Sequence, residues 1–399
     1  MTSTNRRPSF AFNLSSARAL LFLSAVTLST ATLLLSGCGS FFSCEGKTQC
    51  PSTGTTGGGG TTGVNYLYVS DSITANTDIN GYAPSSTAVT ATPSSPYNLD
   101  FIPSAIAITP SNSFIYISSE SSTGSVYGYS IGTGGQPSIL NTGTPILNDD
   151  VASMDISPDG QWLFALDALI QQVEIYSINT TNGALTFSSA VPLVGAPNGD
   201  LTPISVKVAP SGAFVVCSLG TGGANVFAFD TTTGVPNLAG VTGIVPATAA
   251  TGIYAATWDA NNFLYTAGTA GLQVFTVNAT GGPTLVKTYA TGTAPRSVLV
   301  NSTSTAIYVG NQTDGTITGY TIGANAALTA ITGSPFAAPP TVSALATDST
   351  GGYLIAAGYD GSKGIQLYTI STTGVLTPVA SAGTGTGTTA PAIVMAATH

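Results

Sequence analysis

Two short apolar patterns recur seven times along this chain at a nearly constant spacing. The first is a four-residue, mainly apolar run, whose third positions are Tyr68, Tyr116, Phe164, Val216, Tyr265, Tyr308 and Ile355. The second follows each copy of the first and ends in an aromatic residue, at Tyr82, Tyr129, Tyr176, Phe229, Phe275, Tyr320 and Tyr368. Both patterns return every 43 to 53 residues. The chain is therefore a tandem array of equivalent units.

Each repeat carries four strand-like segments separated by turn residues. In the second repeat these segments span 105–108, 114–118, 125–131 and 139–146. Glycine next to Asp, Ser, Asn or another Gly stands between such segments, which is typical of tight turns. The 3.6-residue period of a long helix is missing after residue 35. Since four strands in roughly 40–50 residues make a β-propeller blade, we predict an all-β chain of seven four-stranded blades.

The two ends of the array are complementary. The array begins at Tyr66 within a second-strand segment and lacks a first strand of its own. The last apolar segment, residues 391–397, has the pattern of a first strand without successors. Pairing the two segments would remove the open edges of the ring. We therefore expect one seven-bladed β-propeller over residues 64–399, closed by strand exchange between the N- and C-termini.

Residues 1–37 have the organisation of a bacterial export signal. Three arginines precede an apolar stretch at 19–35, which ends in Leu35-Ser36-Gly37-Cys38. This ending resembles the lipobox of bacterial lipoproteins, in which the cysteine receives a lipid and becomes the new N-terminus. An uncleaved membrane helix is the alternative, although 17 residues are short for a span, and the paired arginines also resemble a twin-arginine signal. We expect a signal peptide at 1–37 and a lipid on Cys38 that anchors the protein to the membrane of the cell envelope. Gly39 favours the outer membrane, with the protein facing the periplasm or the cell surface.

Gly, Ser and Thr dominate residues 38–63, with four consecutive glycines at 57–60. This composition predicts a flexible tether. Cys44 and Cys50 lie within it and could close a small disulfide loop in an oxidising compartment. Cys217 lies in an apolar strand segment instead, and we expect a buried thiol there.

Charged side chains are scarce in this sequence. The 8 Lys+Arg and 17 Asp+Glu make up 6% of the residues, against roughly 25% in an average soluble protein. This composition excludes coiled coils, helical bundles with Glu/Lys faces and charge-rich disordered chains. The formal net charge of −9 argues against a nucleic-acid partner, because nucleic-acid binding depends on clustered Lys and Arg.

One repeat carries a more specific pattern, made of Pro295-Arg296-Ser297, then Asn301, then Asn311-Gln312. The repeats and this segment resemble the seven-bladed lactonase family, which includes 6-phosphogluconolactonases, and also the Tyr-Val-Thr-Asn repeat propellers of microbial surface proteins. Lactonase blades often read Pro-Arg-His, His-Pro-x-Gly and Asn-Glu at these places. Arg296 and Asn311 match that pattern, while both histidines and the glutamate are replaced. The resemblance implies a propeller fold and the hydrolysis of a sugar lactone.

These replacements remove side chains that lactone hydrolysis would use. The reaction needs a base to activate water and a donor or cation to hold the developing oxyanion. The only histidine, His399, ends the sequence, so we expect neither a histidine triad nor a histidine-rich zinc site, and we predict no metal and no other cofactor. Carboxylates remain as bases, and the loops of one propeller face would gather them near Arg296. The candidate ligand-binding residues are Arg296, Ser297, Asn311, Gln312, Glu120 and Asp167.

Three functions are compatible with these observations. We expect first a lipid-anchored, non-catalytic propeller that acts as a binding module and presents one face to an unknown protein or small ligand. The alternatives are a hydrolase of sugar lactones, implied by the family resemblance, and a structural propeller of the cell surface.

Overall fold

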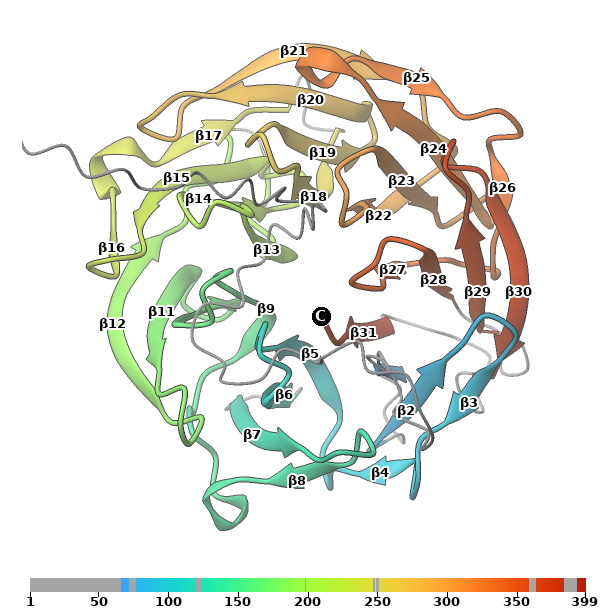
Figure 1. Cartoon of the computed structure of the whole chain (residues 1–399). Coiled ribbons are helices and arrows are strands. Elements are labelled where there is room, and N and C mark those ends of the chain that lie inside the picture. The colour runs from blue at the N-terminus through green and yellow to red at the C-terminus, as the bar shows by residue number, and fades with distance from the viewer. Residues whose placement is uncertain are drawn as a thin grey trace, which may run out of the picture. The chain divides into compact units, whose positions relative to one another are not determined.

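The folded part of the chain is a ring of seven antiparallel sheets (Figure 1). The computed structural model describes residues 66–71, 77–119, 124–197, 199–246, 248, 251–358, 364–383 and 393–399. Each sheet has four strand positions, counted from the ring centre outward, as the repeats predict. Four residues singled out by sequence lie outside the described ranges: Cys38, Cys44, Cys50 and Glu120.

In each blade the strands run from the innermost to the outermost, and three outermost positions are split into two short strands. Blade 1 contains β31 (Ile393–Ala397), β1 (Leu67–Asp71), β2 (Asp78–Pro84), β3 (Val89–Ala91) and β4 (Tyr97–Asn98). Blade 2 contains β5 (Pro103–Ile108), β6 (Phe114–Ser119), β7 (Ser125–Ile131) and β8 (Pro137–Ile139). Blade 3 contains β9 (Val151–Ile156), β10 (Trp162–Asp167), β11 (Gln172–Ile178) and β12 (Leu185–Pro192). Blade 4 contains β13 (Ser205–Val208), β14 (Phe214–Ser218), β15 (Ala224–Asp230), β16 (Val235–Pro236) and β17 (Thr242–Ile244).

The remaining three blades follow the same order. Blade 5 contains β18 (Ile253–Trp258), β19 (Leu264–Gly268), β20 (Gly271–Val277) and β21 (Pro283–Tyr289). Blade 6 contains β22 (Pro295–Val300), β23 (Ala306–Asn311), β24 (Thr316–Ile322), β25 (Leu328–Ala330) and β26 (Phe336–Ala337). Blade 7 contains β27 (Ala344–Thr347), β28 (Tyr353–Ala357), β29 (Ile365–Ile370) and β30 (Leu376–Ala382). Three short 3-10 turns lie between strands: η1 (Asn141–Gly143), η2 (Leu238–Gly240) and η3 (Ala324–Ala326). No helix of the described ranges is long and apolar enough to cross a membrane.

Blade 1 combines strands from both ends of the described chain. β31 pairs antiparallel with β1, from Leu67 opposite Ala397 to Asp71 opposite Ile393. Past this ladder, the Asn112 side chain accepts a hydrogen bond from the His399 amide at 2.8 Å and donates one to the His399 carbonyl at 2.6 Å. His399 therefore ends the chain beside blade 2, near the centre of the ring (Figure 1).

The second strands are buried on both sides because each sheet packs between two neighbours. Every residue of β6, β19 and β23 is buried, which explains why the apolar runs in the sequence are continuous rather than alternating. Cys217 of β14 is a fully buried free cysteine, as predicted.

Three tyrosines of the first repeated pattern fasten their blade to the next one. Their side chains are fully buried, and the hydroxyl of each donates to a glycine carbonyl in a turn between the third and fourth strands of the following blade. The pairs are Tyr68 with Gly135 at 2.7 Å, Tyr116 with Gly183 at 2.9 Å and Tyr308 with Gly374 at 2.7 Å. Burial raises the pKa of each hydroxyl, so these groups stay protonated donors.

Tyrosines of the second pattern reach back to the preceding blade. Three of their hydroxyls donate to carbonyls at the end of its outermost strand or just after it: Tyr82 to Gly383 at 2.9 Å, Tyr320 to Ala290 at 2.5 Å and Tyr368 to Ala337 at 2.7 Å. Six of the repeated tyrosines thus form two sets of hydrogen bonds that join neighbouring blades.

Candidate functional site

The five described candidate residues, Arg296, Ser297, Asn311, Gln312 and Asp167, lie on one face of the ring, which we call the upper face. It is formed by the loops that join second to third strands and by the connections from each outermost strand to the next blade. Because strands alternate in direction, a residue at the start of an innermost strand also lies there. Arg296 is the second residue of β22 and Tyr254 the second residue of β18, so both reach this face.

Arg296 is an exposed cation held against an aromatic ring. Its guanidinium carbon lies 3.8 Å from the centroid of the Tyr254 ring, which is a cation–π contact between blades 6 and 5. The one ion pair of the described residues joins Lys207 to Asp155, at 3.3 Å, near the opposite ends of β13 and β9. No described carboxylate therefore neutralises Arg296. A stacked guanidinium without an acidic partner can receive an anionic or carbonyl oxygen.

Asn311 and Asp314 shape the loop that leads to Arg296. The fully buried Asn311 accepts a hydrogen bond from the Gly292 amide at 3.1 Å and donates to the hydroxyls of Thr316 and Thr318 at 3.1 and 2.9 Å. Its side-chain amide therefore holds the loop in place, and a ligand contact through Asn311 stays a prediction. The exposed Asp314 accepts from the Thr293 amide through Oδ2 at 2.6 Å, three residues before Arg296.

The other residues of the lactonase-like segment are placed differently from one another. Ser297 is buried and its hydroxyl has no hydrogen-bond partner. Gln312 is half-buried, and its backbone amide donates to the Ala294 carbonyl at 2.9 Å. Asn301 lies in the turn after β22, at the opposite face, where its Oδ1 accepts from the Thr305 and Ala306 amides at 2.9 Å each. The pattern therefore spans both ends of one blade and does not form a single cluster.

A second group of polar side chains lies on the upper face of blade 3. Asp149, Asp167 and Glu174 bring ligand oxygens within 4.8 Å of one another, and Asp167 and Glu174 are only 3% and 7% exposed. Tyr176 lies between two of them: its hydroxyl is 2.7 Å from Oδ2 of Asp149 and 2.5 Å from Oε2 of Glu174. At this position the tyrosine meets a carboxylate where its equivalents in other blades meet a carbonyl.

Tyr176 bridges two carboxylates of this acidic group. Its hydroxyl has one hydrogen and lies within hydrogen-bond distance of both Asp149 and Glu174. Burial raises the pKa of Glu174, and Asp149 adds to the rise, while the hydrogen bond from Tyr176 opposes it. Asp150 follows Asp149 in the chain, and its pKa is raised mainly by burial and further by the charge of Asp167. Three carboxylates this close also form a ligand set for a hard cation, and Tyr176 contacts two of them.

The structure does not bring the two groups together. Arg296 belongs to blade 6 and Asp167 to blade 3, so they share a face but lie three blades apart around the ring (Figure 1). Sequence reasoning missed Tyr254, Glu174 and Tyr176 as site residues. A glutamate inside the apolar run of β11 was the available signal for the acidic group.

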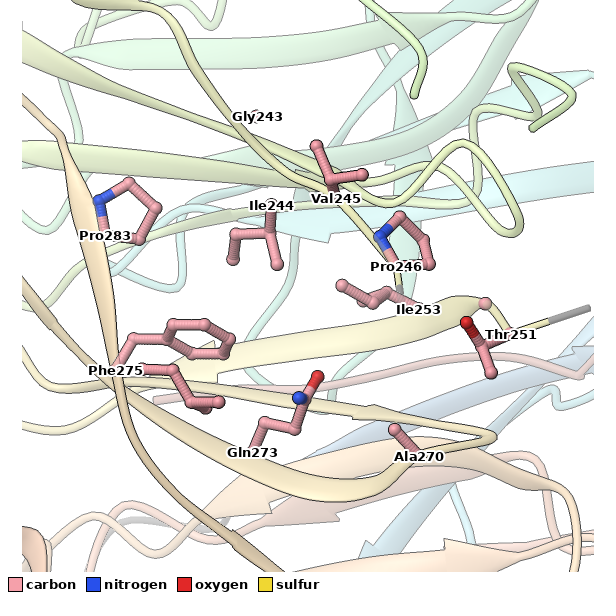
Figure 2. Close-up of a pocket in the computed structure, with 12 residues that line it drawn as sticks. Gly243, Ile244, Val245, Pro246, Thr251, Ile253, Ala270, Gln273, Phe275 and Pro283 are labelled. Atoms are coloured by element: carbon pink, nitrogen blue, oxygen red, sulfur yellow. The ribbon is translucent and has the colours of Figure 1, made fainter. Parts of the chain in front are cut away.

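A cavity of about 340 Å³ opens between blades 4 and 5 (Figure 2). Its walls are mostly apolar and include Ile244, Ile253 and Phe275, and the side-chain amide of Gln273 lies among them. Ile253 directly precedes Tyr254 in β18, so the strand that carries the ring under Arg296 also lines the cavity.

Comparisons with known proteins agree with this architecture. The model of the family described as lactonase, 7-bladed beta-propeller, matches residues 74–208, 225–345 and 263–392. A candidate 6-phosphogluconolactonase of Bacteroides uniformis is 15% identical, with a TM-score of 0.67, 84% of this chain and 99% of that chain covered. The periplasmic gluconolactonase of Pseudomonas aeruginosa is 14% identical, with a TM-score of 0.65 and coverage of 83% and 99%. A functionally unknown protein of Desulfotomaculum acetoxidans is 15% identical, with a TM-score of 0.63 and coverage of 84% and 99%. At these identities the likenesses show the fold; among curated proteins no sequence matches.

Proposed function

Because the chain belongs to the seven-bladed lactonase propeller family, we propose that it hydrolyses a lactone at the upper face around Arg296. The observation that carries this proposal is the exposed guanidinium, which is stacked on Tyr254 and has no carboxylate partner among the described residues. A cation already in place stabilises negative charge that develops on a carbonyl oxygen without having to reorganise during the reaction.

The reaction opens a cyclic ester with water. Water attacks the carbonyl carbon, and its proton passes to a carboxylate, for which we propose Asp314 because it is bonded to the loop that leads to Arg296. Arg296 holds the oxyanion, the ring C–O bond then breaks, and the leaving alkoxide takes up a proton to give the hydroxy acid. This assignment uses neither the replaced histidine positions nor a cofactor.

The family relationship favours this function over the non-catalytic binding module that we expected first. That expectation rested on the replaced histidines and glutamate. An arginine and a carboxylate can divide the work between oxyanion stabilisation and general base, so these replacements do not exclude turnover.

The test is hydrolysis of gluconolactone by the purified protein, measured as acid release at a rate above that of the uncatalysed reaction. Arg296→Ala should lower kcat/KM roughly 10- to 150-fold, which corresponds to loss of a charge-assisted hydrogen bond of about 1.5–3 kcal/mol. Asp314→Asn should lower kcat more than it raises KM. Lys207→Ala removes a cation that pairs with Asp155 at the other face, and should leave the rate unchanged. Equal rates for Arg296→Ala and Lys207→Ala would exclude this site, and saturable binding without turnover would restore the non-catalytic module.

A further inference from the structure

An apolar surface adjoins Arg296 on the blade 4 side. Tyr254, under the guanidinium, and Ile204, just before β13, flank the same glycine: a Cβ atom on Gly220 would lie 3.9 Å from Tyr254 and 3.4 Å from Ile204. Thr202, also 3.6 Å from that point, is exposed. A ligand whose oxygen contacts Arg296 on this side therefore lies over aromatic and aliphatic carbon.

This apolar surface continues across blade 4 toward blade 3. A Cβ atom on Gly195 would lie 3.3 Å from Leu201, and Val194 beside it is 63% exposed. Gln171 donates a hydrogen bond to the Leu201 carbonyl at 3.4 Å, at the end of a turn that carries two more exposed apolar side chains. Half-buried and exposed apolar side chains thus follow one another from Tyr254 to Val194, and apolar surface of this kind is typical of binding sites.

The charges around this surface disfavour a phosphate. Arg296 is the only cation of the upper face in the described part of the chain; Lys207 is near the opposite face, and Lys287 is on the outermost strand of blade 5, 4.9 Å from the Tyr289 ring. At the far edge stands the exposed carboxylate of Asp200, whose amide is bonded to the Thr221 hydroxyl at 3.1 Å. A phosphate group carries nearly two negative charges and is recognised by clustered cationic donors.

We infer that the substrate is an unphosphorylated lactone with an apolar substituent, its carbonyl on Arg296 and its substituent over Tyr254, Ile204 and Leu201. This inference rests on the proposed lactonase function for the choice of a lactone, but the contacts that would bind the ligand can be tested without turnover. Within the described residues, the single cation of this face serves the carbonyl oxygen, and no second one lies beside the apolar surface for another anion. The acyl or alkyl part of the substrate would cover carbon that is otherwise exposed to water.

Binding of non-hydrolysable δ-lactams, measured by calorimetry, tests the inference without relying on turnover. We would compare a δ-lactam that bears a hexyl chain with gluconolactam and with gluconolactam 6-phosphate. The hexyl lactam should bind at least about tenfold more tightly than the phosphate, because its chain buries apolar surface. Tighter binding of the phosphate would overturn the inference, and so would failure of all three lactams to bind.

Two variants probe the surface itself. Ile204→Asn should weaken binding of the hexyl lactam about tenfold and leave gluconolactam unchanged. Thr202→Lys, on the exposed edge, should strengthen binding of the 6-phosphate, whereas Gln161→Lys adds the same charge at the exposed turn of the opposite face and should not. Hexyl-lactam binding that is insensitive to Ile204→Asn would place the ligand elsewhere and refute the inference. Selective hexyl-lactam binding without hydrolysis of any lactone would refute only the proposed function, whereas preferred hydrolysis of the phosphorylated lactone would refute only the inference.

Discussion

Tyr116→Phe should destabilise the ring measurably although it removes one oxygen atom. The Tyr116 side chain is fully buried, and its hydroxyl donates to the Gly183 carbonyl of the next blade at 2.9 Å. Phenylalanine keeps the ring in place but leaves the carbonyl without this donor. Because no water reaches a site of this burial, the loss includes the desolvation cost of the carbonyl.

The magnitude follows from the burial of the bond. A buried hydrogen bond with one partner left unsatisfied costs about 1–3 kcal/mol, and we expect the middle of that range, about 2 kcal/mol. For about 330 residues the unfolding entropy is about 0.7 kcal/mol per kelvin, so Tm should fall by about 3 °C. The equivalent changes at Tyr68 and Tyr308 remove bonds to different glycines and should add, which gives about 9 °C for the triple variant.

Differential scanning calorimetry of the purified protein measures this effect. Tyr127→Phe is the matched control, because Tyr127 stacks on Phe101 at 4.6 Å between ring centroids and its hydroxyl has no hydrogen bond within the described residues. The reasoning fails if the triple variant melts at the temperature of the control.

Two further predictions concern the acidic group and the shared blade. Burial raises the folded-state pKa of Glu174 above its ordinary value of 4.5, so the stability that this group contributes is fully present below pH 4.5 and is lost as pH rises through the folded pKa. Glu174→Gln should flatten this decline and make the protein more stable at pH 7. A urea-unfolding profile from pH 4 to 8 that is the same for the variant and the parent protein would contradict the shift. Deleting residues 393–399 removes β31 and exposes the edge of β1, so we expect lower Tm or aggregation in size-exclusion chromatography, whereas normal melting and elution would show that β31 contributes little.

The strands could be predicted from sequence because their determinants are local. Residues such as Phe114 and Ile115 belong to continuous apolar runs, and turn residues mark where each run ends. The number of blades followed from counting these runs. The tyrosine hydroxyls were beyond such reasoning, because Tyr116 and Gly183 are 67 residues apart and meet only when two blades pack.

The sequence predicted which face of the propeller carries the candidate residues, but not how far apart they lie around the ring. Strand direction places Arg296 and Asp167 on the same face, yet their blades are three apart. Asn311 matched the family pattern in identity, but its hydrogen bonds to Gly292 and two threonines are a property of the folded loop. The stacking of Arg296 on Tyr254 depends on contact between two blades, which no short motif records.

The contact between Arg296 and Tyr254 also crosses a boundary where one blade-to-blade fastening is missing. Tyr265, the blade 5 member of the first tyrosine set, turns its hydroxyl to Asp259 of its own blade at 3.0 Å and does not reach blade 6. Transient separation of blades 5 and 6 would dismantle the candidate site while both sheets stay folded. Amide hydrogen exchange along β18 and β22 would then report how long the site exists at all, and a bound ligand that bridges the two residues would slow that exchange.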